Sequence, residues 1–191
     1  MTEAKQAQTA ATELPVAPGV WAIDPAHSSI VFSVRHLGLS KVWGRFDRFE
    51  AWTQVGATVE ETKVTAEIDM ASVDTNNAMR DDHLRSTDFF NIEQHPTMRF
   101  ASTRITGSDN AWVLEGEVTI NGITRRLVLD VEFFGTEKFA DGKTHAGFSA
   151  TGELRRSEFG IEFGLLPIGV DKLALADKVH FELDLQFVEP S

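Results

Sequence analysis

The feature that most constrains this chain is a hydrophobic period of two residues, which recurs along most of its length. Residues 64–70 place Val, Ala, Ile and Met at every second position, and residues 179–187 repeat the pattern with Val, Phe and Leu. Alternate side chains of a β-strand lie on opposite faces, so each such segment predicts a strand with one buried face. We count about eight segments, each about eight to twelve residues long.

Turn signals separate the segments and indicate how two of them pair. Asn121-Gly122 lies between alternating segments at 112–120 and 123–133, and this dipeptide is typical of the type I′ turn in a two-residue β-hairpin. Asp141-Gly142 precedes another alternating segment. The chain therefore predicts an antiparallel meander.

One segment, residues 77–86, departs from the alternation. It is rich in Ala, Met, Leu and Arg, with apolar positions at helical spacing, which predicts a short helix begun by Asp74 or Asn76 as its N-cap. A single helical turn is also expected at 157–163.

The length of 191 residues suits one domain, and 42% hydrophobic residues are enough to fill or line its interior. We expect this domain to span residues 20–191. Residues 1–19 show no periodicity and contain Pro15, Pro18 and Gly19, so they are expected to form a flexible arm.

Charge and cysteine content exclude several classes of function. There are 18 Lys and Arg against 29 Asp and Glu, which gives a net charge of −11. Such a surface repels phosphate backbones, so no nucleic-acid partner is expected. There is no cysteine, which excludes disulfides, thiolate metal sites and a thiol nucleophile.

No segment has the apolar length of a secretory signal or a membrane span. We therefore expect a cytoplasmic protein without stable membrane insertion. A leader that was removed from the natural chain is the alternative.

Eight strands with one apolar face hide that face and both sheet edges when they close into a barrel. Such a barrel either fills with side chains or holds one small ligand. Long strands make a tall barrel that is hard to fill, and several inward positions are small: Ala66, Gly116, Ala146, Ala150 and Gly152. Small residues also accommodate aromatic neighbours in a solid core, so the hollow and the filled interior both stay open.

Four separated motifs carry a resemblance to a known family. They are WAIDPAHSSIVFSVRHLGLSKVWGRF at 21–46, RDDHLRSTDFFNIEQHPTMRFAST at 80–103, VTINGITRRLVLDV at 118–131 and ELRRSEFGI at 153–161. With these motifs in order over nearly the whole domain, the chain resembles the YceI-like family of polyisoprenoid-binding, lipocalin-like barrel proteins. The resemblance implies an all-β fold, an extended eight-stranded antiparallel lipocalin-like β-barrel with a short helical insertion. It also implies a pocket for a long isoprenoid or similar amphiphile, and a homodimer.

On this basis we expect the ligand to contact inward strand positions, the helix and the barrel mouth. The expected contacts are Phe32, Val34, His36, Phe46, Ile68, Met79, His83, Leu84, Phe89, Phe90, Phe100, Val118, Ile120, Leu129, Phe133, Phe148, Phe159 and Phe181. Phe89 and Phe90 fit ordinary core or a lid over the mouth equally well. No cofactor is expected apart from the bound amphiphile.

Asp81, Asp82 and His83 form the main candidate for chemistry, because a carboxylate beside an imidazole can serve acid–base catalysis. We favour the alternative, a polar network that ties the helix to the barrel rim. His83 and His95 lie twelve residues apart with Glu93 between them, which matches no metal-binding spacing, so no metal is expected.

Polar side chains near the end of one strand are candidates for head-group contacts. His36 ends the apolar face of residues 30–34 and could donate to a head group, or lie in the core with its hydrogen bonds satisfied. Arg35, Arg45 and Arg48 could pair with a diphosphate, although solvated strand-face arginines are the default.

The sequence therefore predicts a protein that carries, stores or sequesters a long isoprenoid-type lipid and is not an enzyme. Two alternatives stay open. One is an enzyme that acts on a hydrophobic substrate through Asp81, Asp82 and His83. The other is a scavenger that binds varied amphiphiles without specificity.

Overall fold

The computed structural model describes residues 14–165 and 174–190, so residues 1–13 of the arm expected at 1–19 lie outside the described residues. The strands are β1 (Gly19–Ile23), β2 (Ser29–His36), β3 (Ser40–Phe46), β4 (Phe49–Val55), β5 (Lys63–Asp69), β6 (Val73–Asp74), β7 (Thr97–Ser108), β8 (Ala111–Ile120), β9 (Ile123–Lys138), β10 (Thr144–Arg155) and β11 (Leu175–Val188). The helices are α1 (Ala78–Arg85) and the 3₁₀ turns η1 (Pro25–His27), η2 (Met70–Ser72) and η3 (Arg156–Phe159).

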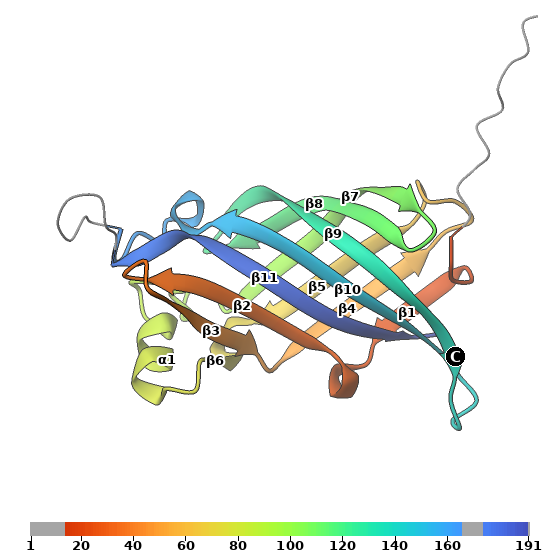
Figure 1. Ribbon diagram of the computed structural model, residues 1–191, viewed down its shortest axis with the longest axis horizontal. Helices are drawn as coiled ribbons and strands as arrows, with labels where there is room; N and C mark the ends of the chain where they lie inside the picture. The colour runs from red at the N-terminus through yellow and green to blue at the C-terminus, as the bar shows by residue number, and fades with distance from the viewer. Residues whose placement is uncertain (1–13, 166–173, 191) are drawn as a thin grey trace, which may run out of the picture.

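Eight strands close into an antiparallel barrel, in the order β1, β4, β5, β7, β8, β9, β10, β11 and back to β1 (Figure 1). The ring closes where Ala22 and Ile23 of β1 lie opposite Val188 and Phe187 of β11. The predicted eight-stranded antiparallel barrel is therefore confirmed.

The remaining strands β2, β3 and β6 extend the sheet from β11. β11 pairs with β1 near its end and with β2 along the rest of its length, because η1 interrupts the chain between β1 and β2. Two other pairs of consecutive strands are also separated by short breaks. Residues 47–48 separate β3 from β4, and η2 separates β5 from β6. Ser72 joins these two breaks, since its hydroxyl accepts from Arg48 N at 3.0 Å and donates to Asp69 O at 2.6 Å.

The predicted hairpin turn is confirmed. Asn121 and Gly122 have φ of 51° and 73°, the two positive values that a type I′ turn requires, and Ile120 lies opposite Ile123. Gly142 at φ 85° likewise forms the turn between β9 and β10.

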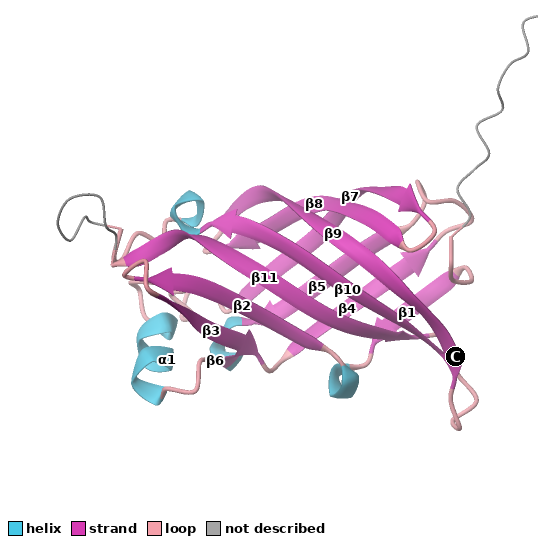
Figure 2. Cartoon of the chain, viewed as in Figure 1, coloured by secondary structure: helices cyan, strands magenta, loops and turns pink. Residues whose placement is uncertain are grey.

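Helix α1 covers one end of the barrel beside β6 (Figure 2), and its N-cap corrects the prediction. The cap is Asn77, whose side-chain oxygen accepts from Arg80 N at 3.0 Å, and not Asp74 or Asn76. Asn76 has φ of 58°, in the left-handed region, whereas an N-cap needs extended backbone. The turn expected at 157–163 is the 3₁₀ helix η3, which ends at Gly160 with φ of 72°.

None of the helices formed by the described residues has the length and apolar composition to cross a bilayer.

Candidate ligand-binding cavity

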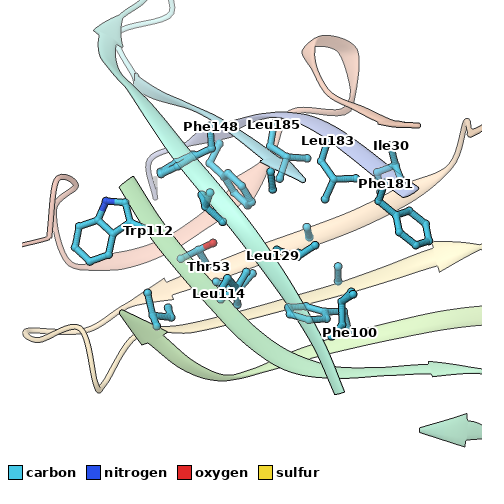
Figure 3. Close-up of a pocket in the computed structure, with 18 of the residues that line it drawn as sticks. Ile30, Thr53, Phe100, Trp112, Leu114, Leu129, Phe148, Phe181, Leu183 and Leu185 are labelled. Atoms are coloured by element: carbon cyan, nitrogen blue, oxygen red, sulfur yellow. The ribbon is translucent and has the colours of Figure 1, made fainter. Parts of the chain in front are cut away.

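The end of the barrel far from α1, which we call the upper end, contains a cavity of about 200 Å³ between β4, β5 and the long strands β7 to β11 (Figure 3). Its walls are the inward faces of these strands, closed at one end by residues that precede β1. The lining residues are Leu14, Pro15, Val16, Ile30, Phe49, Ala51, Thr53, Val55, Thr62, Val64, Ala66, Ile68, Met98, Phe100, Ile105, Trp112, Leu114, Val118, Leu127, Leu129, Val131, Phe148, Ala150, Leu154, Phe181, Leu183, Leu185 and Phe187. We call this space the upper cavity.

A second cavity of about 80 Å³ adjoins it at the level of β2, β3 and α1. This lower cavity is lined by Phe32, Val34, Phe46, Met70, Leu84, Phe89, Phe90, Met98, Ile120, Leu154, Arg156, Phe159, Ile161, Leu175, Val179 and Phe181. Three side chains, Met98, Leu154 and Phe181, line both cavities and therefore form the partition between them. The sequence left the hollow and the filled interior open, and the barrel is hollow in both places.

Some small inward residues nevertheless accommodate aromatic rings, which was the alternative explanation for them in the sequence. A Cβ atom at Gly116 would lie 2.4 Å from Cζ of Phe100, and one at Gly44 would lie 2.3 Å from Cζ of Phe32. Ala66 and Ala150, by contrast, line the upper cavity. The small inward positions therefore divide between accommodating rings and leaving space.

The linings are almost entirely apolar, which decides what each cavity can hold. A buried water needs two to four polar partners, so a space of this kind stays dry and suits a hydrocarbon. Thr62 lines the upper cavity, but its hydroxyl donates to Thr58 O at 3.0 Å and accepts from Gly56 N at 3.1 Å. The indole N–H of Trp112 donates to Asp109 O at 3.1 Å. Neither polar group is free for a ligand.

In the part of the chain that the structure describes, Arg156 is the one charged residue that lines the lower cavity, and its guanidinium is hydrogen-bonded to backbone carbonyl groups. Its N–H groups donate to the carbonyl oxygens of Ala176, Ile161, Phe163 and Leu175 at 2.8, 3.0, 2.7 and 2.9 Å. Burial lowers the pKa of this guanidinium. Arg156 therefore ties η3 to the start of β11 and closes this end of the barrel.

The other end of the upper cavity is closed by Leu14, Pro15 and Val16, which we call the N-terminal strap. Leu14 and Val16 pack against the buried cluster around Trp21. The indole N–H of Trp21 donates to Ala17 O at 2.9 Å and holds the end of the strap. Residues that the sequence placed in an arm therefore form part of the cavity wall.

Most of the side chains that the sequence predicted as ligand contacts line one of the cavities. The upper cavity has Ile68, Phe100, Val118, Leu129, Phe148 and Phe181. The lower cavity has Phe32, Val34, Phe46, Leu84, Phe89, Phe90, Ile120 and Phe159, and shares Phe181. Phe89 is buried and lies in the lower-cavity wall, where it contributes both to the core and to the closure of that end.

Four predicted contacts line neither cavity. Met79 is 84% exposed on α1, and His36 is exposed at the end of β2. His83 lies behind Phe89, with ring centroids 5.1 Å apart. Phe133 packs on Phe148 at a centroid distance of 5.1 Å, beside the register shift between β9 and β10.

The candidate catalytic cluster is not brought together. Asp81 is buried and accepts from Thr75, whereas Asp82 pairs with Arg85 at 3.0 Å. His83 Nε2 lies 2.8 Å from Asp88 instead. The three side chains have three different partners, which is the arrangement of a network that fastens α1.

The arginines proposed for a diphosphate are also engaged outside the barrel. Arg45 pairs with Asp47 and Asp74, both at 2.7 Å, and Arg48 with Asp69 at 2.9 Å. The Arg35 guanidinium donates to a backbone carbonyl, that of Leu39. None of the three lines either cavity.

The predicted contacts did not include most of the upper-cavity lining, and two groups among the missed residues show why. Trp112, Leu114, Leu183 and Leu185 share the inward parity of their strands, so the alternation could have identified them. The strap at residues 14–16 gave no signal, because it has no periodicity and its role depends on where the barrel mouth lies.

Comparison with known proteins gives one consistent result. A model of the YceI-like domain matches residues 21–187. The UPF0312 protein plu2095 of Photorhabdus laumondii is 38% identical over 142 residues, which cover 74% of each chain. A UPF0312 protein of Serratia proteamaculans is 37% identical over 150 residues, which cover 76% of each.

Solved structures share the fold. The Campylobacter jejuni YCEI protein superposes with a TM-score of 0.70 at 30% identity, covering 82% of this chain and 90% of that one. BcnA of Burkholderia cenocepacia gives 0.74 at 22% identity, covering 86% and 98%. A polyisoprenoid binding domain from Saccharophagus degradans gives 0.68 at 13% identity, covering 89% and 98%. The closed barrel, its hollow interior and the match over nearly the whole domain place this chain in the YceI-like family.

Proposed function

We propose that this protein binds a long hydrophobic lipid of the isoprenoid type inside its barrel and so carries, stores or sequesters it. The observation that supports this most directly is the pair of adjoining cavities of about 200 and 80 Å³, lined almost entirely by apolar side chains. An elongated apolar space of this kind matches a flexible hydrocarbon chain.

The tail of the lipid would supply the affinity. Burial of each methylene contributes about 0.8 kcal/mol, so about a dozen such groups contribute near 10 kcal/mol before the costs of ordering the chain. The lining offers few polar partners, so a polar head adds little inside the barrel.

The name of one structural relative agrees with this proposal, since the Saccharophagus degradans domain is described as polyisoprenoid binding. We infer binding and not catalysis, because Asp81, Asp82 and His83 are each engaged by a different partner.

The test is extraction of the purified protein with organic solvent, followed by mass spectrometry, together with titration of the delipidated protein with farnesol. We expect a co-purified prenyl lipid, or saturable uptake of farnesol that raises the melting temperature. Absence of both a co-purified lipid and uptake would overturn the proposal. Competition between farnesol and an unrelated fatty amide distinguishes a specific binder from a scavenger.

The cytoplasmic location and the homodimer stay predictions. Light scattering coupled to size-exclusion chromatography tests the second of these.

A further inference from the structure

Thr53 is the residue of the upper cavity whose polar group has no assigned role. It lies on the inward face of β4, between Ala51 and Val55 along the strand. Its cross-strand neighbours are Trp21 on β1 and Val64 on β5. The hydroxyl therefore sits on a face whose surrounding side chains are apolar.

Within the described part of the chain, the Thr53 hydroxyl has no hydrogen-bond partner, in contrast to Thr62, Trp112 and Arg156. Figure 3 shows the side chain inside the cavity, in this view between Trp112 and Leu129 and below Phe148. A hydroxyl that faces carbon without a partner loses free energy that a ligand oxygen can restore. Without a ligand, threonine at this position is less favourable than valine, which has the same shape and no hydroxyl to satisfy.

The charge around the cavity restricts the kind of oxygen that Thr53 can meet. Among the described residues, those that line the upper cavity include no Lys, Arg, His, Asp or Glu. A phosphate or carboxylate buried there would lose its hydration without gaining a cation, which costs far more than burial of a neutral group. An alcohol, ester or quinone oxygen needs only one hydrogen bond.

We propose that the Thr53 hydroxyl binds an uncharged oxygen of the ligand, so that the end of the ligand held in the upper cavity is a neutral oxygenated group. This inference rests on the proposed function and adds to it the chemical class of the buried end. Thr53 thereby determines specificity between oxygenated prenyl lipids and plain or charged ones of the same length.

The test measures the affinity of delipidated protein for farnesol, farnesene and farnesyl diphosphate, which share one chain and differ in the end group. We expect Thr53→Val to weaken farnesol binding about three- to tenfold and to leave farnesene binding unchanged, with Thr53→Ser close to the wild type. We expect farnesyl diphosphate to bind less tightly than farnesol.

The matched control is Thr65→Val, at an exposed threonine on the outer face of β5, which should change neither affinity. Unchanged farnesene binding also shows that Thr53→Val folds. If Thr53→Val weakens farnesol and farnesene equally, or weakens neither, or if the diphosphate binds more tightly than farnesol, the inference is wrong while the proposed function stands. If none of the three probes binds, the proposed function itself fails.

Discussion

The carboxylate of Asp81 accepts two hydrogen bonds from Thr75, one from the backbone N–H at 2.9 Å and one from the hydroxyl at 2.5 Å. Both residues are buried, and Arg80 donates to the same hydroxyl at 2.7 Å. Thr75→Val keeps the shape of the side chain but leaves a buried carboxylate one hydrogen bond short. We expect the free energy of unfolding to fall by about 1–3 kcal/mol in chemical denaturation. Thr75→Ser is the control, and an equal loss in that variant would show that the methyl group matters instead.

The N-terminal strap should control the rate at which ligand leaves the upper cavity. Leu14 and Val16 are apolar and pack over the cavity mouth, so replacing both by Ser weakens the closure. We expect the dissociation rate of bound farnesol to rise about fivefold or more in stopped-flow displacement. Val20→Ser is the control, because Val20 is 53% exposed on β1. A rate that rises equally in the control would mean that the strap does not close the mouth.

The partition residue Phe181 should set the length of chain that fits. It lines both cavities together with Met98 and Leu154, so Phe181→Ala removes the aromatic ring from the partition and widens the passage between them. We expect the affinity for a C20 prenyl alcohol to rise relative to that for a C15 alcohol, while stability falls by about 3 kcal/mol. Phe134→Ala, at a ring that is 62% exposed on β9, is the control. No change in the ratio of the two affinities would show that ligands do not cross the partition.

A side chain at position 116 should lower the stability of the barrel. A Cβ atom there would lie 2.4 Å from Cζ of Phe100 and 2.6 Å from Ala101 O, and the second neighbour is backbone that cannot turn away. We expect Gly116→Ala to lower the free energy of unfolding by about 1–3 kcal/mol. Gly147→Ala, whose Cβ would meet Phe134 Cβ at an ordinary 3.7 Å, should cost much less. Equal costs in thermal denaturation would contradict this reading of the packing.

Stability should depend on pH through Asp177, which joins η3 to β11. Burial raises the pKa of this carboxyl, but hydrogen bonds from Ser157 and Arg155 outweigh burial, and its pKa lies below the ordinary 3.8. A lowered pKa in the folded state stabilises the protein above the unfolded-state pKa, and this contribution is lost as pH falls through the folded-state value. We therefore expect Asp177→Asn to be less stable than the wild type at neutral pH. The difference in free energy of unfolding should shrink towards about pH 2, and a constant difference would exclude this linkage.

Local patterns predicted the barrel because each acts over a few residues. Asn121-Gly122 specifies a turn by its own backbone preferences, and the alternation in residues 179–187 specifies which face of β11 is buried. The N-cap was wrong by one residue because Asn76 and Asn77 are chemically alike. Only their backbone angles, which the surrounding fold imposes, distinguish them.

The candidate site was less accessible to sequence reasoning, since contacts across the barrel decide it. His83 was paired with the neighbouring Asp81 and Asp82, but the turn after α1 brings Asp88 to 2.8 Å instead. The inward parity of Thr53 is visible in β4. Its lack of a hydrogen-bond partner is a property of the assembled cavity, which no local pattern encodes.

The breaks between β1 and β2, β3 and β4, and β5 and β6 divide one wall of the barrel into two panels, whereas β7 to β11 form an unbroken wall opposite. Within the described residues β6 pairs only with β3, and α1 covers the sheet edge that β6 leaves, because the Arg85 guanidinium donates to the carbonyl oxygens of Ala71 and Val73 at 3.0 and 2.9 Å. The end of the barrel formed by β2, β3 and β6 is therefore fastened to α1 by the guanidinium of Arg85, whereas continuous backbone ladders hold the opposite wall.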